Sequence, residues 1–280
     1  MVGNSRRSLA RDPWFGTAGL LALALLALAV LGPALTPHDP HDISFAPLSP
    51  PSAEHWLGTN DGGMDLASEL VHGLRHTAWF GLLGGSTALV LGVGIGLAAA
   101  WFGGAVDAFC MRLADVLLAI PTVMLLILAA VLVRPTPTLL AVLLACLIWP
   151  TTAKGIRAQA LVLRNRLHVR AAQQMGASGR YVIVRHLVPE LFPLYLVSFV
   201  GKTRLAVTME ATLAFLGLFD PGHLSLGLMI RTGSQFYYLA GWWHWLLPPV
   251  ACLTLLLLAL TCLAVSLEQA FDPRLVGGWR

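Results

Sequence analysis

The chain has 280 residues, of which 57% are hydrophobic and only 11% are charged, and its formal net charge is +4. Several apolar runs reach the roughly 20 helical residues needed to cross a hydrocarbon core of about 30 Å. This composition excludes an ordinary soluble protein and predicts a polytopic membrane protein, and so small a basic excess gives no support to nucleic-acid binding.

Six apolar stretches predict transmembrane helices. The runs are rich in Leu and Ala and show no alternation of period two, which favours helices over a β-barrel. The predicted spans are residues 14–35, 79–102, 113–133, 138–153, 191–218 and 245–267. The apolar core of the first is too long for a cleaved signal, so we expect it to remain as a span.

Glycines crowd the second predicted span, at positions 84, 85, 92, 94 and 96. The missing side chains would let a neighbouring helix approach closely. A dinucleotide-binding loop is excluded here, because no strand precedes the glycines and the third glycine of that fingerprint is absent.

The segment between the first two spans is rich in Pro, His and Asp, and residues 66–75 within it look helical. His72 and His76 are spaced four apart, as two metal ligands on one helix can be. Single histidines on a wet surface are commoner, so we predict no metal site and keep this pair as a weak candidate.

The basic residues predict the orientation in the membrane. Three arginines fall on one side, at positions 75, 134 and 231, and thirteen Lys or Arg residues fall on the other. This larger group includes three arginines in the N-terminal tail and seven basic residues between positions 154 and 190. We therefore expect both termini and the 154–190 loop to lie in the cytoplasm.

That loop is expected to contain a short helix over residues 167–175. Gly176 and Gly179 would end it, and a second helix would run to residue 187 before Pro189 forces a turn into the next span. A short helix joined rigidly to a span can transmit force to a soluble partner.

Lys202 and Arg204 lie inside the fifth predicted span, about 14 to 17 Å from its cytoplasmic end. The GKT triplet at 201–203 is not a phosphate-binding loop, because Leu196 stands where that motif needs a glycine. A cation facing lipid at this depth costs about 3 kcal/mol. We therefore expect Lys202, Arg204 and the nearby Glu210 either to line a translocation path or to be structural pairs at a subunit interface.

Ala171 and Ala172, followed by Gly176 and by HLVP at 186–189, resemble the cytoplasmic signature of ABC-importer permeases. Further motifs resemble the second permease subunit of the dipeptide, oligopeptide and nickel import family, and they stand in that family's order: HWLGT at 55–59, GGAVDAFCMRLADVLLAIPTVML at 103–125, EATLAFLGL at 210–218 and DPRL at 272–275. Two positions depart from the pattern. Arg170 replaces a common Glu, and Met64 replaces an arginine in the outer segment.

The resemblance implies an all-α type I importer permease fold with six transmembrane helices and a cytoplasmic coupling helix. It divides the chain into residues 1–77, with the tail, first span and outer segment, and residues 78–280, the core permease domain with the coupling loop. The residues expected to contact an ATPase are Arg170, Ala171, Ala172, Gly176, Ala177, His186 and Pro189.

The implied partners are a homologous permease in a heterodimer, two ATPase subunits that bind ATP and Mg, and an extracytoplasmic solute-binding protein. The implied location is the bacterial inner membrane, in contact with its lipid. The chain itself would hold no cofactor and no catalytic residue. The implied cargo is a peptide or related small solute, with nickel or a metal–chelator complex as the alternative.

Two other functional classes fit less well. An intramembrane serine protease would need a serine and a histidine at one depth, whereas Ser86 lies inside its helix without the GxSxG setting and His244 lies at a membrane edge. A secondary transporter without an ATPase would leave the 171–189 segment without a role, and the chain shows no internal repeat.

Overall fold

A computed structural model of the chain describes residues 13–133, 135–219, 222–238 and 241–271. Its regular elements are almost all helical, and the only strand pairing in the described part is an isolated bridge between Thr59 and Asp65. The long helices are α2 (Pro13–Leu35), α3 (Leu66–Phe102), α4 (Gly104–Ala119), α5 (Thr122–Val133), α6 (Pro137–Arg164), α10 (Phe192–Phe215), α11 (Leu226–Gln235) and α12 (Trp243–Phe271). Shorter elements between α6 and α10 are α7 (Leu167–Gln174), α8 (Gly179–Val182), a π-helical turn (Ile183–Leu187) and α9 (Val188–Glu190).

Within the described residues, four helices are long and apolar enough to cross a membrane singly, namely α2, α3, α6 and α12. Two bent pairs raise the number to six if each pair is one span: α4 with α5, and α8–α9 with α10. The all-helical prediction with six spans is confirmed in this form.

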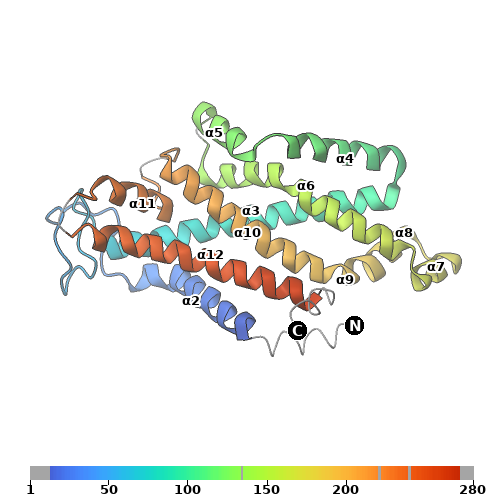
Figure 1. Ribbon diagram of the computed structural model, residues 1–280, viewed down its shortest axis with the longest axis horizontal. Helices are drawn as coiled ribbons and strands as arrows, with labels where there is room; N and C mark the ends of the chain where they lie inside the picture. The colour runs from blue at the N-terminus through green and yellow to red at the C-terminus, as the bar shows by residue number, and fades with distance from the viewer. Residues whose placement is uncertain (1–12, 134, 220–221, 239–240, 272–280) are drawn as a thin grey trace.

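Helix α3 forms the centre of the bundle and packs against α6 and α10 (Figure 1). Its 37 residues extend about 55 Å, so both ends project beyond a hydrocarbon core. The predicted helix at 66–75 and the predicted second span are therefore one element, and the proposed division at residues 77 and 78 falls inside it.

The glycines of α3 allow its close packing. A Cβ added at Gly85 would lie 2.4 Å from the Thr203 hydroxyl of α10, and one added at Gly96 would lie 2.6 Å from the Ala153 carbonyl of α6. Gly94 has no atom within 4 Å of its added Cβ, so this glycine does not take part in the contact.

The third predicted span, residues 113–133, is not one continuous helix. Helices α4 and α5 meet at an angle of 79°. Pro121 explains the break, because a proline disfavours helical geometry in the residue before it, and Ile120 is extended, with φ −100° and ψ 130°. The helix also begins nine residues earlier than predicted, at Gly104.

The fourth predicted span, residues 138–153, continues to Arg164 as α6 because its basic residues find acidic partners. Lys154 pairs with Asp115, and Arg157 pairs with Asp107, so two ion pairs join α6 to α4. The prediction ended this span at its first cation, Lys154. In the structure Lys154 is paired with Asp115 of α4, so the helix continues past it.

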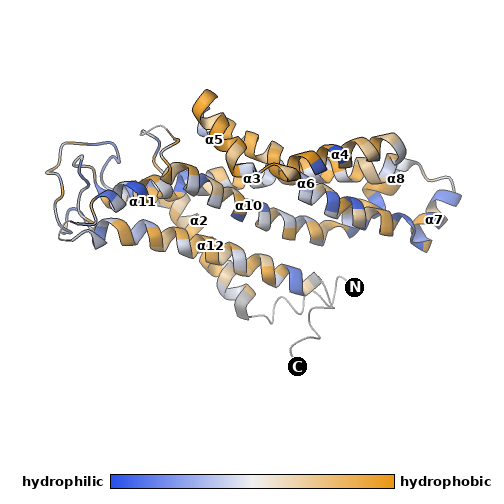
Figure 2. Ribbon diagram, turned by 45° about the horizontal axis from the view of Figure 1, so that its top comes forward, coloured by the Kyte–Doolittle hydropathy of each residue, from blue (hydrophilic) through white to orange (hydrophobic). Residues whose placement is uncertain are grey.

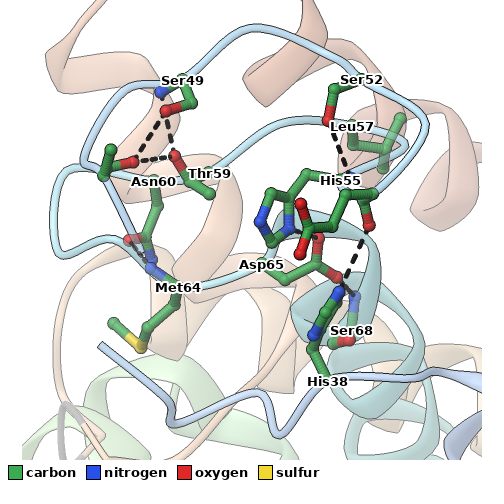
Figure 3. A network of polar contacts seen from close by, with 12 residues as sticks. His38, Ser49, Ser52, His55, Leu57, Thr59, Asn60, Met64, Asp65 and Ser68 are labelled. Atoms are coloured by element: carbon green, nitrogen blue, oxygen red, sulfur yellow. Dashed lines mark hydrogen bonds and ion pairs between the residues drawn. The ribbon is translucent and has the colours of Figure 1, made fainter. Parts of the chain in front are cut away.

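The loop between α2 and α3 is folded by buried polar contacts (Figure 3). The His55 Nδ1 atom lies 3.0 Å from the Asp65 carboxylate, whose other oxygen accepts from the Ser68 amide and caps α3. Asn60 accepts from the Met64 amide and donates to Glu69, which fixes the loop directly on the first turn of α3.

Hydrophilic residues gather at the two ends of the bundle and apolar residues along its length (Figure 2). The α2–α3 loop and α11 lie at one end, whereas α7, the start of α2 and the end of α12 lie towards the other (Figure 1). The basic N-terminal tail and the DPRL motif at 272–275 lie outside the described residues.

Candidate functional site

Helix α7 lies at the end of the bundle, away from the α2–α3 loop (Figure 1). Its inner face carries Val169 and Ala172, which are both buried, and Val169 belongs to a cluster with residues of α6 and the π-helical turn. Its outer face carries Leu167 and Met175, which are 88% and 82% exposed, with Ala171 exposed between them. Residues 167, 171 and 175 share one side of a helix, so they form an apolar outer ridge.

The N-terminal end of α7 is tied to the base of α10. Glu190 accepts from the Arg166 guanidinium at 3.0 Å and lies 2.8 Å from the His168 Nε2 atom. Arg170 is exposed and donates to the Asn165 side chain at 2.9 Å. The start of α7 is therefore joined through one carboxylate to α9, directly before α10.

Gly176 ends α7, as predicted. Its φ of +88° lies in the left-handed region that favours glycine. The Gly176 amide donates to the Gln173 carbonyl and the Ala177 amide to the Ala172 carbonyl, the two bonds of a Schellman motif.

The chain after this turn departs from the predicted single helix to residue 187. Gly179 begins α8. A Cβ added at this glycine would lie 2.6 Å from the Trp101 ring, so the missing side chain allows the ring to pack closely against the backbone. A π-helical turn follows, and α9 then contains Pro189 at its first turn. His186 is half-buried, with its ring 5.8 Å from that of His168.

Lys202 is only 9% exposed at the middle of α10. Its Nζ atom donates to the Ile148 carbonyl at 2.6 Å and also to the Thr151 hydroxyl. Both acceptors belong to α6, so the ammonium group joins α10 to α6 through two uncharged oxygen atoms.

Arg204 has its hydrogen bond to a different helix from that of Lys202, towards α12. Its side chain is exposed, and its hydrogen bond within the described residues is a long one of 3.4 Å to the Thr261 hydroxyl of α12. Figure 1 shows α10 crossing between α6 and α12. Arg204 is therefore a central cation on an uncovered face.

An open hollow of about 330 Å³ lies beside both cations. Its lining consists of Thr151, Thr152, Ser198, Gly201, Lys202, Arg204 and Leu205, from α6 and α10. These side chains are more polar than the rest of the two helices, which is the property expected of a surface facing water or cargo in a membrane.

Glu210 does not line this hollow. It is 0% exposed, so its carboxylate is enclosed by the bundle. Its polar neighbours are the hydroxyls of Thr77 on α3 and Ser225 at the start of α11. Of the three residues expected to line a path, only Lys202 and Arg204 lie together at the hollow.

The two weak metal candidates, His72 and His76, lie near the start of α3. His72 and His76 border a second hollow of about 480 Å³ together with His38 and His41. Among the described residues, no group of three or more His, Cys, Asp or Glu side chains is placed to hold a metal ion.

The sequence analysis missed two features of this region, a row of threonines on α10 and the helix α11. Thr208 and Thr212 are exposed on the same side as Arg204, one and two turns further along the helix. Helix α11, which covers Glu210, was also missed. The signal in the sequence was the spacing of four residues between Arg204, Thr208 and Thr212, which places them on one side of a helix.

Residues 92–277 match the model of a family described as binding-protein-dependent transport system inner membrane component. A putative peptide transport system permease protein of Brucella abortus is 34% identical, over 96% of this chain and 90% of that protein. The dipeptide transport system permease protein DppC of Bacillus subtilis is 31% identical, over 96% and 87%. The oligopeptide transport system permease protein OppC of Mycobacterium bovis is 31% identical, over 91% and 89%. The region matched to the family includes α7 and all of α10.

Proposed function

We propose that this chain, which belongs to the family of binding-protein-dependent transport system inner membrane components, is the permease subunit through which an ATP-driven importer moves short peptides. Family membership makes the chain an integral inner-membrane component that works with a solute-binding protein and an ATPase. The exposed apolar ridge of α7, held on a buried base, is the observation that carries the coupling role.

The ATPase subunits are proposed to bind ATP and Mg and to receive α7 in a groove. An amphipathic helix that presents residues at i, i+4 and i+8 fits the helix-in-groove mode of recognition. Leu167, Ala171 and Met175 would enter that groove. Arg170 lies beside the ridge and would meet its rim.

Coupling follows from the packing of α7. Val169 shares a cluster with Ile156 of α6 and with Leu187 and Leu191 before α10. When ATP binding closes two ATPase subunits, a displacement of α7 would pass to the inner ends of α6 and α10. The result is alternating access without catalytic chemistry in this chain.

A second, homologous permease is proposed to complete the path. Helices α4 and α5 expose large apolar side chains, including Phe109, Val116 and Leu132, and the face of α10 that carries Arg204 is open. A related subunit would cover this open face in a heterodimer, and lipid would cover apolar surface elsewhere.

Peptides are favoured as cargo over nickel. The relatives described above are named as peptide, dipeptide and oligopeptide permeases. A metal–chelator complex is therefore not favoured.

The proposed orientation places both termini and α7 in the cytoplasm. The basic residues between 154 and 190 support it, and so does the position of α7 at the end of the bundle opposite the α2–α3 loop. The α2–α3 loop would then face the binding protein.

Cysteine crosslinking in the assembled complex tests the docking of α7. Ala171 is exposed, whereas Ala172 is 9% exposed and faces the chain's own core. With exposed Cys146 replaced by serine, Ala171→Cys should crosslink to an ATPase groove cysteine, and Ala172→Cys should not. If the chain purifies without an ATPase when the neighbouring genes are co-expressed, the proposed function is wrong.

A further inference from the structure

The two cations of α10 have different structural positions, although they are two residues apart. Lys202 uses two of its three N–H donors on oxygen atoms of α6. Arg204 has five N–H donors, and the described residues accept a single hydrogen bond from them, at 3.4 Å. Lys202 is therefore a positioning residue, and Arg204 is free to bind another group.

Arg204 lies halfway along the 24 residues of α10, about 18 Å from either end. A guanidinium at this depth needs water, a carboxylate or another polar partner. Its planar fork can bind a carboxylate through two parallel hydrogen bonds, which a lysine cannot do.

Thr208 and Thr212 continue the exposed row of Arg204 at successive turns. Their hydroxyls donate to the carbonyl oxygens of Arg204 and Thr208, at 3.0 and 2.7 Å. The hydroxyl protons are occupied, so the outward lone pairs of the two oxygens can only accept. The row has a cation at one end, halfway along α10, and two acceptors beyond it, towards the end of α10 that leads to α11.

We propose that Arg204 binds the carboxylate of the cargo during translocation, and that Thr208 and Thr212 accept N–H groups of the same molecule. The site selects a peptide or similar amide with a free carboxylate, entering with that carboxylate foremost. The row spans about 12 Å, which matches three to four extended peptide residues. This inference rests on the proposed function and assigns the cargo chemistry of that path.

The test uses the complete complex in vesicles, with its binding protein saturated by either of two tripeptides that differ only in a free or amidated C-terminus. The variants are Arg204→Gln, Arg204→Lys and the control Arg75→Gln, which removes an exposed arginine from the outer end of α3. We expect the wild type to transport the free acid about tenfold faster, as one guanidinium–carboxylate contact allows. Arg204→Gln should bring the two rates together, whereas Arg204→Lys should keep part of the preference and Arg75→Gln all of it.

Chemical restoration of the charge separates binding from folding. Arg204→Cys, with Cys146 replaced by serine, is assembled first and then treated with an aminoethyl or a methyl thiosulfonate. The aminoethyl reagent restores a cation and should restore the preference, and the methyl reagent should not. A preference that is unchanged by Arg204→Gln, or unaffected by either reagent, would overturn the inference and assign Arg204 to a pair with the second permease.

Failure of the proposed function gives a different result. In that case the wild-type complex transports neither peptide, and its ATP hydrolysis does not respond to the loaded binding protein. If the wild type transports both peptides at equal rates, the proposed function stands and the carboxylate site is wrong.

Discussion

Replacing Leu167 by alanine should weaken ATPase binding without destabilising the chain. The side chain is 88% exposed, so its removal costs the isolated chain almost nothing. Once buried in a partner groove, the three lost carbon groups would be worth about 2 kcal/mol, or roughly thirtyfold in Kd. Val169→Ala on the opposite face should destabilise the chain and leave ATPase affinity unchanged. This fully buried side chain contributes about 2 kcal/mol to the stability of the chain itself.

Two measurements on the same preparations distinguish these effects. Thermal unfolding in detergent reports chain stability, and titration of the purified permease with its ATPase reports affinity. Leu216→Ala serves as the control, since Leu216 is 51% exposed at the far end of α10. The reasoning is refuted if Leu167→Ala changes ATPase affinity less than twofold, or lowers the melting temperature as much as Val169→Ala does.

Three further substitutions test the packing and the polar contacts. Gly85→Ala should lower stability by about 1–3 kcal/mol, because the new methyl group would overlap α10, whereas Gly94→Ala should leave the melting temperature unchanged. Glu190→Gln should change stability by less than about 1 kcal/mol, since its ion pairs are partly exposed, but amide hydrogen exchange in α7 should become faster. Asp65→Asn should weaken a buried pair and make the α2–α3 loop sensitive to protease, and exposed Asp61→Asn should not; equal cleavage of the two variants would contradict the role of the buried pair.

Local signals predicted the membrane helices and the end of α7 well. A long apolar run has one stable form in a bilayer, and Gly176 ends a helix whatever surrounds it. The prediction of one continuous span over residues 113–133 was wrong at Pro121, because the apolar run continues across the break between α4 and α5. Hydrophobic composition does not report a bend in a helix, although a proline in the run predicts one.

Contacts between helices could not be derived from the sequence. Lys154 and Arg157 were read as a loop because their acidic partners lie about 40 to 50 residues earlier in the chain. Glu210 was placed on the path because it shares a helix with Lys202, whereas its side chain is fully buried beside Thr77 of α3 and Ser225 at the start of α11. The angle between Lys202 and Arg204 was predictable, but the helix that each one faces was not.

Helix α3 is one continuous helix of 37 residues that joins the two ends of the bundle. Its outer end is fastened by the Asp65 cap, and its inner end by Arg164, which donates to the carbonyl oxygens of Ala100 and Trp101 at 3.1 Å. A tilt of about 5° around its midpoint would shift each end by roughly 2 Å in opposite directions, since half its length is about 27 Å. In the orientation proposed above, a binding protein that presses on the α2–α3 loop would thereby move the opposite, cytoplasmic end of the bundle.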